Sequence, residues 1–160
     1  MNNLHQKVRT FFQAYENRFT RALQGDNALE GTVDDIEGTV NAFAEHFIEA
    51  SPSGVIAGKN DEAFRRMIPR GNEFYRNIGT CEMKIHNLAI TELDARHVMA
   101  TVQWDSRYEK KNGTLITVSF QVIYLLQHRK NELKIFAYIT GDEQSVLAEA
   151  GLIQEGRSVI

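Results

Sequence analysis

The second half of the chain carries apolar side chains at every second position, which is the period of a β-strand with one face turned to a core. The clearest stretch spans residues 98–108, and residues 116–126 and 133–139 repeat the pattern. Asn112-Gly113, a strong signal for a tight hairpin, lies between the first two stretches. Because the connections are short, we expect an antiparallel meander.

Residues 81–91 form a fourth expected strand, in which the apolar phase changes partway. Met83 and Ile85 share one face of this strand. Leu88 and Ile90 fall on the opposite face. An inserted residue or a sharp bend is needed to bury both pairs, so the pattern predicts a β-bulge. The sheet is therefore expected to be strongly curved.

The first half of the chain has the spacing of helices instead. In residues 4–23, apolar side chains recur at intervals of three and four, the period of one helical face. A second helix is expected to begin near residue 32, and its acidic first turn suits a helix N-terminus. Its buried face would include Val40, Phe43, Phe47 and Ile48.

A Ser-Pro-Ser-Gly break at residues 51–54 ends that helix, and residues 55–57 form a short strand. A third helix is expected from Asn60, with a kink or an interruption at Pro69. A short last helix should run from Asp142 to Gly151. Helices followed by strands are typical of an α+β fold. We expect one domain, residues 1–160, with three N-terminal helices packed into a strongly curved, mainly antiparallel sheet.

Charge and composition argue against several partners. The formal net charge is −3 and 24% of residues are charged, which gives no general attraction for nucleic acid or anionic lipid. No apolar run reaches the roughly 18 residues of a membrane span, and the chain shows no apolar leader. The single cysteine, Cys81, indicates a reducing compartment. We therefore expect a cytoplasmic protein with no nucleic-acid or membrane partner.

Several local strings resemble uncharacterised bacterial members of the nuclear transport factor 2-like superfamily, which includes ketosteroid isomerase-like and polyketide cyclase-like proteins. These strings are FRRMIPRG at 64–71, FYR at 74–76, VQWD at 102–105 and IFAYITGDE at 135–143. The resemblance implies a cystatin-like cone, in which a curved sheet wraps around the first helix. It also implies an apolar cavity between sheet and helices, and homodimers that form through the outer face of the sheet.

Two functions from different classes fit this reading. The first is the binding of a lipophilic small molecule, without a cofactor, in a pocket lined by aromatic rings. Isomerase, dehydratase or cyclase chemistry is an open option there, and whether any reaction occurs is undecided. The expected lining is Tyr15, Phe19, Phe43, Phe47, Trp104, Tyr108, Phe120 and Tyr124.

The alternative is a non-catalytic homodimeric interaction or scaffold module with a filled core. The outer sheet face has few charges, which suits the centre of an interface. The residues expected there are Thr117, Ser119, Gln121, Ile123, Phe136 and Tyr138.

Catalytic residues are only weakly indicated. The resemblance suggests a base in the loop after the second helix, but residues 51–54 contain no carboxylate. Tyr15 could donate a hydrogen bond to a developing oxyanion, although a core role is favoured. Asp105 should lie on the face opposite Trp104, where an ion pair with Arg107 is the simpler interpretation.

Metal and thiol chemistry have little support. His46 and Glu49 are three residues apart, but no third ligand stands at a suitable interval, so no metal is expected. Cys81 and His86 should face opposite sides of their strand unless the bulge intervenes. A buried, inert thiol is the favoured interpretation.

Overall fold

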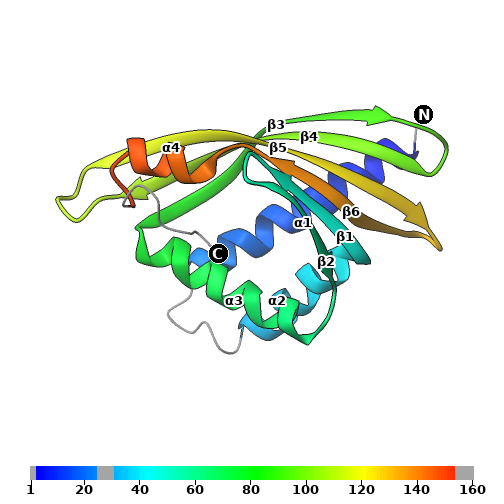
Figure 1. The fold of residues 1–160 in the computed structure, drawn as a ribbon, viewed down its shortest axis with the longest axis horizontal. Coiled ribbons are helices and arrows are strands. Elements are labelled where there is room, and N and C mark those ends of the chain that lie inside the picture. Colours follow the sequence, from blue (N-terminus) through cyan, green and yellow to red (C-terminus); the bar gives the residue numbers. More distant parts are fainter. Residues whose placement is uncertain (1–2, 25–30, 154–160) are drawn as a thin grey trace.

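The computed structural model describes residues 3–24 and 31–153 and forms one helix-covered sheet (Figure 1). The elements in chain order are α1 (Asn3–Gln24), α2 (Gly31–Ala42), β1 (Phe43–Ser51), β2 (Gly54–Lys59), α3 (Glu62–Asn77), β3 (Thr80–Glu92), β4 (His97–Glu109), β5 (Leu115–Arg129), β6 (Glu132–Thr140) and α4 (Glu143–Glu149).

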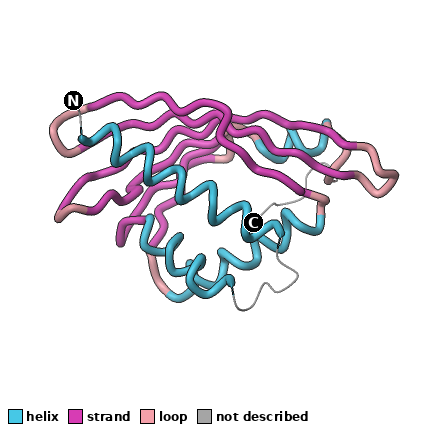
Figure 2. The backbone as a smooth tube through the Cα atoms, turned by 180° about the vertical axis from the view of Figure 1, so that it is seen from behind, coloured by secondary structure: helices cyan, strands magenta, loops and turns pink. Residues whose placement is uncertain are grey.

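The six strands form a single curved sheet in the order β2-β1-β6-β5-β4-β3. All neighbours are antiparallel except β1 and β6, which are parallel. Helices α1, α2 and α3 lie on the concave face of this sheet (Figures 1 and 2). The α+β class, the meander from β3 to β6, the curvature and the short C-terminal helix are therefore confirmed.

The core lies between α1 and the middle of the sheet. Val8 and Phe12, one turn apart on α1, are fully buried. They pack in one cluster with inward side chains of β4 and β5. Along β4 every second side chain from Val98 to Tyr108 is buried, as the alternation predicts. This packing fixes which face of α1 and which face of the sheet meet.

The predicted bulge lies in β3, where the pairing with β4 shifts register between Ile85 and Asn87. The backbone N–H of Ile85 donates a hydrogen bond of 2.9 Å to the Glu16 carboxylate of α1. A charged acceptor makes this a strong bond. The bend in the sheet and the position of α1 are thus tied together at one point.

The second helix is shorter than expected, because α2 ends at Ala42 and residues 43–51 form β1. Spacings of three and four residues fit a helix, but Phe43 and Phe47 also share one face of a strand. Pairing with β2 on one side and β6 on the other supplies the backbone hydrogen bonds that the helix would have made. At the junction, the Asn60 amide donates to the carbonyls of Val40 (2.8 Å) and Phe43 (3.1 Å). Ile48, expected in the core, is 41% exposed.

The third helix also differs from expectation. It begins as predicted, since Asp61 accepts the Phe64 N–H at 3.0 Å. It then continues through Pro69 to Asn77 without interruption.

Strand β6 changes face at Phe136, where its pairing with β5 shifts register between Leu125 and Leu126. Ile135 before the shift is fully buried. Beyond it, Tyr138 turns inward and packs on the rings of Phe43 and Phe47. The prediction that Tyr138 lies on the outer face was therefore wrong, because strict alternation along this strand missed the bulge.

The turn from α3 into β3 generates a stability prediction. Gly79 has a φ of +93°, and an alanine Cβ there would lie 2.2 Å from the backbone oxygen of Glu109. Gly79→Ala should lower the free energy of unfolding by at least about 2 kcal/mol, measured by urea denaturation. Gly71→Ala is the matched control, since its Cβ meets nothing within 4 Å on α3. That change should stabilise by about 0.5–1 kcal/mol. Equal effects of the two substitutions would contradict this description of the turn.

Candidate functional site

A cavity of about 170 Å³ lies between α1 and the concave face of the sheet. Aromatic rings make up most of its wall, and they come from both helices and strands. The lining residues are Tyr15, Phe19, Phe43, Tyr75, Met83, Trp104, Phe120, Val122, Tyr124, Tyr138, Thr140 and Glu143.

The structure places six of the eight expected lining residues at this cavity: Tyr15, Phe19, Phe43, Trp104, Phe120 and Tyr124. The other two lie elsewhere. Phe47 packs against the ring of Phe64, 5.0 Å away between centroids. Tyr108 belongs to a separate cluster with Val118 and Leu147. The reason is that Tyr108 lies near the end of β4, where α4 rather than α1 covers the sheet.

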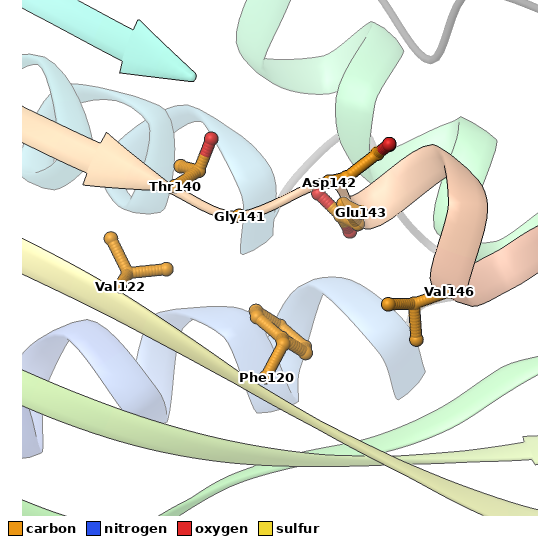
Figure 3. A pocket seen from close by; sticks show the side chains of 7 residues that line it. All are labelled: Phe120, Val122, Thr140, Gly141, Asp142, Glu143 and Val146. Carbon is orange, nitrogen blue, oxygen red and sulfur yellow. The ribbon is translucent and has the colours of Figure 1, made fainter. Parts of the chain in front are cut away.

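A smaller hollow of about 50 Å³ adjoins the cavity near the start of α4. Figure 3 shows Phe120 and Val122 of β5 on one side of it, with Thr140 to Glu143 and Val146 on the other. Phe120, Val122, Thr140 and Glu143 line both spaces. Glu143 therefore stands where the two spaces meet.

Glu143 brings a carboxyl group into this apolar wall. Asp142 caps the short helix by accepting the Ser145 N–H at 3.0 Å, and Glu143 is the first helical residue. The hydroxyl of Tyr75, on α3, donates a short hydrogen bond to Oε1 of Glu143. Burial raises the pKa of Glu143 above its ordinary value, and the bond from Tyr75 opposes that rise.

Phenol groups surround the same space. Burial raises the pKa of Tyr15, Tyr75, Tyr124 and Tyr138, so all four hydroxyls are neutral donors at physiological pH. The Arg18 guanidinium opposes the rise at Tyr15 and lies 5.4 Å from the centre of its ring. The cavity thus combines aromatic faces, hydroxyl donors and one carboxyl group.

Sequence reasoning missed Tyr75 and Glu143. Asp142 predicts a helix cap, and a glutamate directly after a cap is usually a solvated first-turn residue. The only signal was the end of the last strand at Thr140, three residues before Glu143. Strict alternation places Thr140 on the outer face with Tyr138, because it misses the bulge in β6.

The weak catalytic candidate Asp105 lies away from the cavity. Its carboxylate accepts a 2.7 Å hydrogen bond from Ser119 and stands 3.4 Å from Nδ1 of His86. Arg107, its expected partner, instead pairs with Glu82 at 2.9 Å. Tyr15, the other candidate, is at the cavity wall.

The remaining predicted groups form no reactive cluster. Cys81 is exposed, with Sγ 3.3 Å from the Arg107 carbonyl, so the expectation of a buried thiol was wrong. Cys81 lies at the start of β3, which is an edge strand of the sheet, so its side chain is open to solvent. Across residues 3–24 and 31–153, no three His, Cys, Asp or Glu side chains gather as metal ligands would. No helix within these ranges is long and apolar enough to cross a membrane.

Comparisons with solved structures agree with this architecture. Aln2 from a Streptomyces species superposes with a TM-score of 0.62 at 14% identity, covering 93% of this chain and 97% of its own. An NTF-2 like protein of unknown function from Shewanella oneidensis superposes with a TM-score of 0.59 at 14% identity. The match covers 86% of this chain and 98% of that protein. A ketosteroid isomerase-like protein from Erwinia carotovora atroseptica superposes with a TM-score of 0.59 at 13% identity. The match covers 88% of this chain and 97% of that protein. At these identities the likeness concerns the fold alone.

No curated protein shows significant sequence similarity to this chain. The family described as NTF2-like protein (DUF6841), by contrast, matches residues 6–143, from the first turns of α1 to the start of α4. The matched range includes Tyr15, Tyr75 and Glu143 of the cavity. The chain therefore belongs to the NTF2-like protein (DUF6841) family.

Proposed function

We propose that this protein binds a small, largely apolar molecule, about one aromatic ring in size, in the cavity between α1 and the sheet. The volume of about 170 Å³ supports this size. A dry, apolar cavity of about 150 Å³ accepts benzene, whereas sites for drug-sized ligands span about 300–1,000 Å³. A compound of steroid size therefore does not fit this conformation.

The observation that carries the proposal is the Glu143 carboxyl group, hydrogen-bonded by Tyr75 in a wall of rings. A ligand that displaces the Tyr75 hydroxyl would contact a carboxyl group whose pKa burial has raised. A carboxyl group whose pKa is raised above its ordinary value is a better proton acceptor, and it can later return the proton that it takes. We therefore propose proton-transfer chemistry of the isomerase, dehydratase or cyclase kind, with Glu143 as acid or base.

Ligand size is tested by thermal unfolding with single-ring and steroid-sized compounds. At 100 times Kd a ligand adds about 2.7 kcal/mol, which corresponds to a Tm rise of roughly 5–10 °C in a chain of this length. We expect this rise with phenol-, toluene- or indole-sized compounds and none with steroids. Val122→Phe, which places a ring in the cavity, should abolish the effect.

Ile56→Phe is the matched control, because Ile56 is 64% exposed on β2 and lines neither space. It should leave the ligand-induced rise in Tm unchanged. Absence of stabilisation by every single-ring compound, or an unchanged response in Val122→Phe, would contradict the proposal.

The convex face of the sheet supports a second proposal, a homodimer. Two rows of uncharged side chains cross all six strands on this face. One row is Val55, Ala50, Ile139, Ile123, Thr101 and Ala89; the other is Ala57, Ile48, Ala137, Leu125, Met99 and Thr91. A two-fold axis pairs a patch with itself, so a face without charged side chains meets no like-charge repulsion in such a dimer. Such a dimer is compatible with a ligand site on the concave face. A dimer that binds no ligand there would be a scaffold module.

Ile139→Arg, in the middle of the first row, should convert a dimer to a monomer at micromolar concentration, because it buries two unpaired charges at the interface. The measurement is molar mass by light scattering after size exclusion. Leu115→Arg is the control, since Leu115 is 57% exposed but lies outside both rows. A dimer that survives Ile139→Arg would place the interface elsewhere.

A cytoplasmic location is also proposed. It is supported by the single cysteine, which forms no internal disulfide.

A further inference from the structure

The Glu143 side chain is partly buried, and its carboxyl group has no cationic partner in the described part of the chain. No lysine, arginine or histidine nitrogen there lies within 4.0 Å of it, and its hydrogen-bond donor is a neutral phenol. Buried carboxylates are normally paired, because an unpaired one loses its hydration without compensation. The site therefore lacks one positive charge.

The rest of the wall suits a cation as well. Tyr15 and Trp104 stand 6.3 Å apart between ring centroids, and Phe19 and Tyr75 stand 5.8 Å apart. Ring faces carry partial negative charge and attract ammonium groups, most strongly when water is excluded. Aromatic rings around one carboxylate form the usual chemical setting for binding an alkylammonium group.

We infer that the molecule bound in the cavity is a small organic cation, an aryl-alkyl ammonium of about one ring, with its charged nitrogen at Glu143 and its ring among the aromatic side chains. This inference rests on the proposed function and names its ligand class. The ammonium group donates hydrogen bonds to the carboxylate that Tyr75 now contacts. A cation also keeps Glu143 ionised, which is the state that a general base requires.

The guanidinium group of Arg18, which lies beside one ring of the cavity wall, does not occupy the site. Arg18 lies over the ring of Tyr15, but it does not line the cavity. Its Nε donates to the Thr39 hydroxyl at 3.3 Å, which holds it toward α2. The carboxylate therefore remains open to a ligand.

The pH dependence of binding follows from the groups that face Glu143. These are Tyr75 of α3, Tyr108 of β4 and Tyr124 of β5, and burial raises the pKa of each phenol. These phenols stay neutral on acidification, and Glu143 is the group among them that takes up a proton. Its ionised form attracts a cation and its protonated form does not, so the affinity for a cation should fall on acidification.

The test compares three compounds with the same ring and different charge: benzylamine, benzyl alcohol and benzoate. Isothermal titration calorimetry at neutral pH should give benzylamine a Kd at least tenfold lower than that of benzyl alcohol. Benzoate should bind more weakly than either. Benzylamine stays protonated on acidification, whereas Glu143 takes up a proton and loses its charge. The Kd of benzylamine should therefore rise as the pH falls toward about 4, while the Kd of benzyl alcohol stays constant.

Glu143→Gln removes the charge and keeps an oxygen for Tyr75. It should remove the preference for benzylamine and leave the Kd of benzyl alcohol within about twofold. Glu149→Gln makes the same chemical change at an exposed position of α4 and should retain the preference.

The outcomes separate the two proposals. If benzyl alcohol binds as tightly as benzylamine, or benzoate binds best, the cation inference is overturned and the ligand cavity stands. If none of the three binds, the proposed function fails with it. If Glu143→Gln does not fold, the pH series on the unmodified protein decides, because a Kd for benzylamine that is independent of pH would also overturn the inference.

Discussion

The curvature of the sheet determines where α1 packs and where the cavity opens. Register shifts in β3 and β6 bend the sheet around α1 and change which side chains point inward. The bond from the Ile85 N–H to Glu16 fixes α1 at one of these bends. A flat sheet would bring the helix and strands into continuous contact, whereas a curved one leaves a hollow at its concave face.

Most of the side chains that line that hollow are rings rather than flexible aliphatic chains, and this explains why it remains open. Phenyl, phenol and indole groups are rigid, and those in the wall lie 5.8–6.4 Å apart between ring centroids. They leave space that a flexible chain would fill. Glu143 reaches this space because β6 ends at its edge and α4 begins three residues later. The carboxyl group thus comes from the first residue of a short helix, while the sheet and the longer helices supply the rest of the wall.

Much of the fold could be predicted from local pattern. Alternation in β4 predicts its buried side chains, the phase change between Ile85 and Leu88 predicts the bulge in β3, and Asn112-Gly113 predicts the hairpin. Helical spacing failed at Phe43 and Phe47, because the same spacing also fits one strand face and tertiary pairing decided the outcome. Most of the aromatic residues in the cavity wall were predicted from the sequence, but Tyr75 and Glu143 were not. Their pairing joins residues 68 positions apart, and no local pattern encodes such a contact.

The functional proposals for the cavity all require the carboxyl group of Glu143 to lie inside the apolar hollow. A carbon-13 NMR titration of the glutamate side chains measures the pKa of this group. We expect it above the ordinary value for a glutamate, because burial raises the pKa of Glu143. Titration of Glu143 at the ordinary glutamate value would show that its carboxyl group faces water and lies outside the hollow.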